Sequence, residues 1–174
     1  MGLGQQRRGW LGSAVLVVLV AALLLRPWEG LGGADAAGPA SARVLVERVV
    51  DGDTIEVELD GADEDVRYIG VDTPETVKPE SPVECFGPQA SSFNHRLVEG
   101  RQVRLVFGVE RRDVYGRLLA YVYFDHRFVN AELLRRGFAR TLAIAPNDRF
   151  ADRFKRLEIA AARHGRGLWR ACEP

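Results

Sequence analysis

The spacing of apolar and polar residues predicts a strand-rich region that is followed by helices. Five segments alternate apolar and polar side chains with a period near two, which is typical of half-buried strands. These predicted strands are residues 43–50, 53–59, 66–71, 103–109 and 118–124. Asp51-Gly52 between the first two is a hairpin signal, and polar turns are expected at 60–65 and 125–127.

Three helices are predicted from apolar spacing and from the residues that begin and end helices. The first covers residues 88–99, the second 130–136 and the third 148–164, each followed by a glycine, and Asn147 is expected to cap the third. Five strands and three helices make a small α+β domain. A closed or partly open five-stranded barrel would remove the exposed edges of its sheet.

Residues 1–26 resemble a targeting segment. Arg7 and Arg8 precede residues 11–25, which carry no charge and are short for a bilayer span of about 20 residues. One interpretation is a signal peptide, because small-residue cleavage patterns follow it. A retained membrane tether through residues 10–25 and an incidental apolar stretch are the alternatives. The first two predict an extracytoplasmic protein, either secreted or anchored to the membrane.

Composition limits the chain to one globular domain. Residues 27–42 are rich in Gly, Ala and Pro and are predicted to be a flexible linker, so the domain is expected to cover 43–174. This domain has 21 basic and 22 acidic residues, which excludes a bulk polycation. Any attraction for nucleic acid must therefore come from a local patch of charge.

The two cysteines are Cys85 and Cys172. An even cysteine count in an exported protein favours a disulfide, and two separate free thiols are the alternative. The sequence has no Cys-x-x-Cys motif or Cys/His cluster, which argues against a zinc site.

Charged residues recur at the ends of the predicted strands. Asp53 alternates in phase with Ile55 and Val57, and Arg67 alternates in phase with Ile69, so both occupy core-facing positions. Such charges are costly unless they are paired or lie at an open mouth. A structural salt bridge and a functional barrel rim are therefore both consistent with the pattern.

An acid pair follows the third predicted strand, in Asp72-Thr73-Pro74-Glu75. Alone, this segment could be a simple strand-ending turn, because Pro and Thr are common turn residues. Combined with Asp53 and Arg67, it indicates a metal-assisted attack on phosphate.

Six segments together resemble the staphylococcal nuclease (thermonuclease) family, over residues 44–169. They are VVDGDT (49–54), VRYIGVDTPET (66–76), ECFGPQAS (84–91), DVYGRLLAYVY (113–123), VNAELLRRGFA (129–139) and GLW (167–169). The resemblance implies an OB-fold barrel with three helices. It also implies calcium-dependent hydrolysis of DNA and RNA that leaves 3′-phosphate products. No obligate protein partner is implied, and the protein is expected to be a monomer.

The resemblance also assigns roles to individual residues. Asp53 and Asp72 would hold Ca²⁺ with the backbone carbonyl of Thr73, a set of hard oxygen ligands that leaves room for water and substrate. Glu75 would be the general base. The two phosphate-binding arginines would be Arg67 and Arg117, and Tyr115 would contact the phosphate or sugar.

Two positions depart from the family pattern. Val114 stands where a lysine is common, and residues 141–146 lack the usual second tyrosine, so weaker binding of 5′-phosphorylated nucleotides is expected. A non-catalytic binding module and a structural envelope protein are the alternative functions. The retained acids and arginines favour a nuclease over both.

Overall fold

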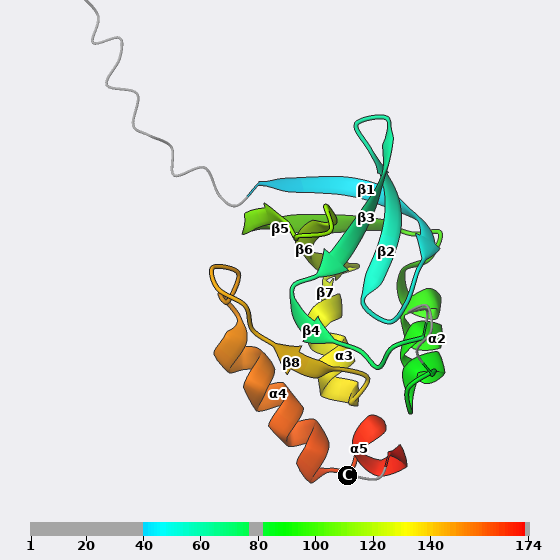
Figure 1. Ribbon diagram of the computed structural model, residues 1–174, viewed down its shortest axis with the longest axis vertical. Helices are drawn as coiled ribbons and strands as arrows, with labels where there is room; N and C mark the ends of the chain where they lie inside the picture. Colours follow the sequence, from blue (N-terminus) through cyan, green and yellow to red (C-terminus); the bar gives the residue numbers. More distant parts are fainter. Residues whose placement is uncertain (1–39, 77–81, 173–174) are drawn as a thin grey trace, which may run out of the picture. The chain divides into compact units, whose positions relative to one another are not determined.

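A computed structural model describes residues 40–76 and 82–172 of the protein (Figure 1). The predicted targeting segment and most of the predicted linker lie outside the described residues. Within the described part, no helix is long and apolar enough to span a membrane.

Five strands form a closed barrel (Figure 1). They are β1 (Ser41–Val49), β2 (Thr54–Leu59), β3 (Ala62–Tyr68), β5 (Gln102–Arg112) and β6 (Leu118–Phe124). Neighbours pair antiparallel in the order β3-β2-β1-β5-β6, and a parallel pairing of β3 with β6 closes the barrel. The α+β five-stranded barrel predicted from the sequence is confirmed. The first strand begins at Ser41, two residues before the predicted domain boundary.

The predicted third strand, 66–71, is divided in two. The turn before it is only Asp60-Gly61, so β3 begins at Ala62 and ends at Tyr68. The chain then bends into β4 (Gly70–Asp72), which pairs with β8 (Arg140–Leu142) in a separate small sheet. A third short strand, β7 (Arg127–Phe128), extends the barrel sheet beside β6.

Gly70 makes this bend possible. Its φ of 80° lies in the left-handed region that glycine adopts easily. A Cβ at Gly70 would also come within 2.6 Å of the Phe154 ring. The short sheet can therefore pack closely against the aromatic side chain of the last long helix.

The three predicted helices are present, with small shifts at their ends. They are α2 (Gly87–Val98), α3 (Val129–Arg136) and α4 (Ala151–Arg163), and a short fourth helix, α5 (Leu168–Ala171), follows. The prediction that Asn147 caps the last long helix is wrong, because its N-cap is Phe150. Asn147 instead exchanges two hydrogen bonds with the main chain of Glu110 at 2.8 and 3.1 Å. This side chain satisfies backbone groups of strand β5 (Gln102–Arg112), as a helix cap would do at a helix terminus.

Branched side chains fill the barrel and aromatic rings attach the helices to it. Ile55, Val57, Val66 and Val122 are fully buried. Buried Asn130 of α3 accepts a hydrogen bond from the Val122 main chain at 2.9 Å and donates one to the Ile69 carbonyl at 2.8 Å. The barrel, the bend after β3 and helix α3 are thus fixed to each other.

The structure contains a disulfide between Cys85 and Cys172, with Cα atoms 5.9 Å apart. It joins the segment before α2 to the end of α5, across 87 residues of sequence. In the chain-entropy treatment a loop of this length stabilises the fold by about 4–5 kcal/mol.

Candidate active site

Asp53 lies in the turn between β1 and β2, and its side chain joins three segments. Its Oδ1 is 2.8 Å from Arg67 Nη1 on β3. Its Oδ2 accepts hydrogen bonds from the Thr73 main-chain nitrogen at 2.6 Å and from Thr73 Oγ1 at 3.0 Å. The turn predicted at Asp51-Gly52 therefore places a carboxylate where it holds the segment after β4.

Burial dominates the electrostatics of Asp53, which is only 3% exposed. Loss of hydration raises the pKa of this carboxyl, and the positive charge of Arg67 opposes that rise. Asp51 nearby raises the pKa further, whereas the hydrogen bonds from Thr73 lower it. A buried carboxylate with this balance gains from any additional positive charge beside it.

Arg67 binds both Asp53 and Asp72, the two carboxylates that the family resemblance assigns to the metal. Besides its contact with Asp53, its Nη2 is 2.8 Å from Asp72 Oδ1 and its Nη1 donates to the Val71 carbonyl at 2.9 Å. The Arg67 side chain is 13% exposed and that of Asp72 is 55% exposed. The salt bridge between Arg67 and Asp53, one of the two alternatives from sequence alone, is therefore present.

The alternating pattern that predicted a core-facing position for Arg67 is wrong. It groups Arg67 with Ile69 on one face, but the bend after Tyr68 separates the two residues. Along β3 the fully buried neighbours are Val66 and Tyr68, and Arg67 points to the other side. Arg67 is therefore outside the barrel interior, where its guanidinium reaches Asp53 and Asp72.

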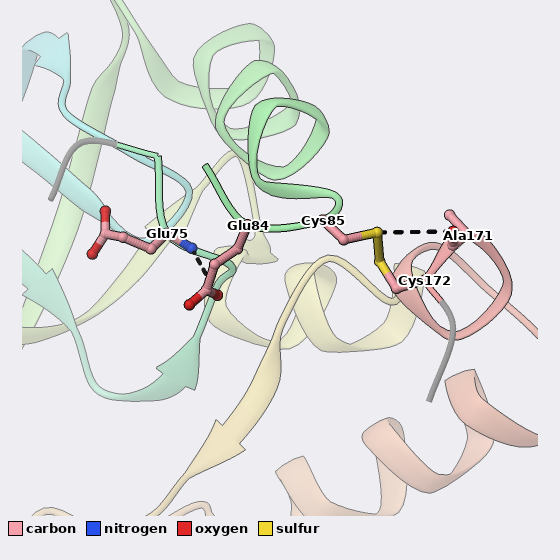
Figure 2. Close-up of a disulfide and its surroundings, with 5 residues drawn as sticks. All are labelled: Glu75, Glu84, Cys85, Ala171 and Cys172. Atoms are coloured by element: carbon pink, nitrogen blue, oxygen red, sulfur yellow. Dashed lines mark hydrogen bonds between the residues drawn. A yellow bond between two sulfur atoms is a disulfide. The ribbon is translucent and has the colours of Figure 1, made fainter. Parts of the chain in front are cut away.

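Glu75 is held by its own segment and by the segment before α2. Its Oε1 accepts a hydrogen bond from the Thr76 main-chain nitrogen at 2.9 Å. Its main-chain nitrogen donates to Glu84 Oε2 at 3.2 Å, and its carbonyl accepts from the Glu84 main-chain nitrogen at 2.9 Å. Figure 2 shows the Glu75 side chain pointing away from the disulfide, while its main-chain nitrogen faces the Glu84 carboxylate.

Arg117 and Tyr115 lie together in the turn before β6. Asp113 Oδ2 binds Arg117 Nε and Nη2, both at 2.7 Å. The Arg117 guanidinium also lies over the Tyr115 ring, 5.4 Å from its centre, a favourable cation–π contact. Tyr115 is 81% exposed, so its ring remains accessible from solvent.

A cavity of about 310 Å³ brings the two arginines to one place. Its lining includes Arg67, Arg117 and Tyr115, together with Leu119 of β6 and the exposed Ile144. Asp53, Asp72 and Glu75 are not among its lining residues. Arg67 connects the two groups, because it faces the cavity and also binds the two aspartates.

The expected metal ligands are oxygens, the chemical type that a hard divalent cation prefers. Asp53 and Asp72 each bind a different nitrogen of the Arg67 guanidinium, and Thr73 follows Asp72 directly in the chain. No group of three or more His, Cys, Asp or Glu residues suited to a metal occurs among residues 40–76 and 82–172. The remaining ligands would have to be water and substrate, an arrangement that Ca²⁺ and Mg²⁺ accept.

Two residues of this site were missed from the sequence. Asp113 orients Arg117, and a signal existed: an Asp that begins a tight turn accepts hydrogen bonds from nitrogens farther along it, here those of Tyr115 and Arg117. Glu84 fixes the Glu75 main chain, and nothing in the sequence pairs residues nine apart across a proline-rich loop.

Comparison with known proteins identifies the family of this chain. Residues 65–171 match the family model described as "Staphylococcal nuclease homologue". The thermonuclease of Staphylococcus intermedius is 43% identical over 125 residues, covering 72% of this chain and 74% of the relative. The thermonuclease of Staphylococcus hyicus is 37% identical over 160 residues, covering 88% and 95%.

A third relative comes from another genus. Endonuclease YncB of Bacillus subtilis (strain 168) is 44% identical over 128 residues, covering 72% of this chain and 61% of the relative. The family match covers more than half of the chain and includes Arg67, Asp72, Glu75 and Arg117. The chain therefore belongs to the staphylococcal nuclease family.

Proposed function

We propose that this nuclease is calcium-dependent and hydrolyses phosphodiester bonds of both DNA and RNA. One observation carries the proposal: Arg67 lines a cavity with Arg117 and also binds both Asp53 and Asp72. Two guanidinium groups directed at one cavity suit a phosphodiester, because arginine can donate two parallel hydrogen bonds to phosphate oxygens. The thermonuclease and endonuclease relatives support the same reaction class.

Asp53, Asp72 and the Thr73 carbonyl would hold the Ca²⁺. Bound there, the cation would add positive charge beside the scissile phosphate and make a coordinated water more acidic. Arg67 would move its hydrogen bonds in part from the aspartates to the phosphate. Because Asp53 is buried and burial raises its pKa, a bound cation would also stabilise its ionised form.

Glu75 would accept the proton of the attacking water. The Thr76 main-chain nitrogen, 2.9 Å from Glu75 Oε1, orients the carboxylate. As the water oxygen bonds to phosphorus, negative charge grows on the equatorial oxygens, and Arg67 and Arg117 neutralise it. Asp113 keeps the Arg117 guanidinium in place for this purpose.

The products proposed from the family resemblance are a 3′-phosphate and a 5′-hydroxyl. The new bond joins the water oxygen to phosphorus, and the bond that breaks joins phosphorus to the 5′-oxygen. The 5′-oxygen takes a proton from solvent, which balances the proton that Glu75 accepts from the attacking water and later returns to solvent. Contacts to the phosphate carry no base information, so a sharp sequence preference is not expected.

We propose an extracytoplasmic location on the basis of residues 1–26. Either the segment is removed and the protein is secreted as a monomer, or residues 10–25 tether it to the membrane. Fractionation of the producing cells and the mass of the mature protein would separate these outcomes. A full-length chain in the cytoplasm would contradict both.

The test of the proposed activity uses the full chain with single-stranded DNA and with RNA, in Ca²⁺ or in excess EDTA. We expect cleavage of both substrates that needs Ca²⁺. Glu75→Gln should lower kcat by at least about 100-fold, the size seen when one preorganised charged or polar group is removed. Glu58→Gln on β2, an exposed acid outside the site, is the matched control and should be unaffected.

Binding of nucleic acid without Ca²⁺-dependent cleavage would contradict the proposal and favour the non-catalytic binding module. A Glu75→Gln variant with wild-type kcat would overturn the role of Glu75 specifically.

A further inference from the structure

We propose that Glu84 is a positioning residue for Glu75, and that the Cys85–Cys172 disulfide fixes Glu84 relative to α5. This inference rests on the proposed function of Glu75 as general base. The two glutamates form a reciprocal pair: the Glu75 main-chain nitrogen donates to Glu84 Oε2, and the Glu84 main-chain nitrogen donates to the Glu75 carbonyl. Hydrogen bonds on both sides of one residue restrict both the position and the rotation of its peptide groups.

Glu84 is exposed, Glu75 is half-buried and the hydrogen bond between them is exposed, so this bond alone would give little rigidity. Glu84 belongs to an exposed segment, and a hydrogen bond in water competes with solvent. The covalent anchor is one residue away, because Cys85 is bonded to Cys172. Figure 2 shows this chain of contacts, from the Glu75 main chain through Glu84 to the disulfide and the end of α5.

The first residue of α2 supports the same arrangement from a second side. A Cβ at Gly87 would lie 2.7 Å from Thr76 Cγ2 and 2.9 Å from the Glu75 carbonyl oxygen. The Glu75 segment therefore packs directly against the N-terminal end of the helix. The Gly87 main-chain nitrogen also donates to the Glu84 carbonyl at 3.0 Å, so helix and pair are connected.

The other end of the disulfide is attached to the helical core. The Leu168 main-chain nitrogen, in the first turn of α5, donates to the Gly137 carbonyl at 2.9 Å. Gly137 and Gly167 approach so closely that a Cβ on either would overlap the main chain of the partner segment. The Cys172 main-chain nitrogen then donates to the Leu168 carbonyl at 3.0 Å. The disulfide thus connects Glu84 to a fixed point at the end of α3.

The expected consequence is specific to the chemical step. A general base transfers a proton only over hydrogen-bond distance, so a small displacement of Glu75 lowers the rate of chemistry. Substrate binding would change little, because the phosphate contacts come from Arg67 and Arg117. Loss of the Glu84 contact should therefore lower kcat and leave KM unchanged.

The main test compares Glu84→Ala with Glu84→Gln in the full chain, each alone and combined with Glu75→Gln. Glutamine retains an oxygen that accepts the Glu75 N–H, whereas alanine does not. We expect Glu84→Ala to lower kcat about tenfold and to leave KM unchanged. This loss is smaller than the roughly 100-fold that a displacement of a catalytic group by about 1 Å can cause. Glu84→Gln should stay within about twofold of wild type. In the Glu75→Gln background, Glu84→Ala should have no further effect.

The disulfide is tested with Cys85→Ser/Cys172→Ser, with and without Glu84→Ala. We expect a similar loss of kcat, and the combined variant should lose less than the product of the two separate losses. Leu105→Ala in the barrel core is the control for lowered stability. It should lower the melting temperature and leave kcat unchanged at a temperature where every variant is folded.

The outcomes separate the two proposals. If Glu75→Gln keeps its activity, the role of Glu75 in the proposed function fails. If Glu75→Gln is inactive while Glu84→Ala keeps wild-type kcat, only the present inference fails. A Glu84→Gln variant as slow as Glu84→Ala, or a Glu84→Ala effect that persists fully without the Glu75 carboxylate, would also overturn it.

Discussion

Gly52 and Thr73 pack in direct contact: a Cβ at Gly52 would lie 2.6 Å from Thr73 Oγ1 and 2.8 Å from Thr73 Cβ. The turn after β1 and the segment after β4 can approach closely only because residue 52 has no side chain. That approach lets Asp53 accept both hydrogen bonds from Thr73.

Gly52→Ala should therefore disturb the proposed metal ligands Asp53 and Thr73 first. We expect the Ca²⁺ concentration for half-maximal activity to rise at least tenfold, and the free energy of unfolding to fall by about 1–3 kcal/mol from overpacking. Calcium titrations of activity and denaturant unfolding would measure the two effects.

Gly61→Ala is the matched control for this substitution. A methyl group at Gly61 would have nothing within 4 Å, but the φ of 80° is unfavourable for alanine. It should lose stability while keeping the wild-type Ca²⁺ requirement. Equal calcium titrations for the Gly52 variant and wild type would contradict the proposed geometry.

Arg67→Lys should impair activity more than Arg117→Lys. One ammonium group cannot bridge Asp53 and Asp72 as the guanidinium does, and it cannot bind phosphate in a bidentate way. We expect kcat at saturating Ca²⁺ to fall at least about 100-fold for Arg67→Lys. Arg135→Lys on α3, whose guanidinium pairs with Glu132, serves as the control and should keep wild-type kcat.

Nucleotides with a 5′-phosphate should bind more tightly after two substitutions that restore the family pattern. Val114 is 94% exposed beside Tyr115, and Ile144 is exposed on the cavity lining. Val114→Lys would add a cation, and Ile144→Tyr would add a stacking ring worth about 1–3 kcal/mol. Calorimetric titration with a nucleoside 3′,5′-bisphosphate measures the gain; unchanged affinity in both variants would show that the departures do not limit binding.

Glu158 should make stability depend on pH in the acid range. It is buried on α4, which disfavours its charged form, but hydrogen bonds from Lys155 and Thr141 outweigh burial and lower the pKa of Glu158 below 4.5. A carboxyl with a lowered pKa stabilises the fold above the unfolded value, and this stabilisation is lost as the pH falls through the folded value.

Glu158→Gln should therefore cost about 1–3 kcal/mol of unfolding free energy near neutral pH. The difference from wild type should shrink as the pH falls below about 4.5, where the native carboxyl also becomes protonated. Urea unfolding of both proteins at several pH values is the measurement. A constant difference across that range would rule out a contribution from ionisation.

The barrel could be predicted because each long strand carries its own signal. The β2 strand has buried Ile55 and Val57 on one face, and its turn residues are local in sequence. The turn predicted at 125–127 also has a local signal, and Asp125 and His126 adopt positive φ values there. Closure of the sheet follows from the need to remove its edges, which does not depend on any single residue.

Other features depended on contacts that no local pattern contains. Asn147 resembles a helix cap in sequence, but the main chain of Glu110, 37 positions away, offers it two hydrogen bonds. The close packing of Gly70 against Phe154 of α4 also joins residues that lie far apart in the chain. The sequence left a salt bridge and a rim position both open for Arg67, whereas its simultaneous contact with Asp53 and Asp72 depends on how β3 and β4 diverge.

The parallel pairing that closes the barrel has a biological consequence. Arg67 lies on β3 between Thr54 of β2 and Leu119 of β6, so its main chain has a paired strand on each side, one of them across the closing parallel pairing. Separating β3 from β6 would disrupt the barrel and the proposed phosphate site together. A partly digested or heat-damaged molecule should therefore lose its enzymatic activity with its fold, and proteolysis should leave no active fragments behind.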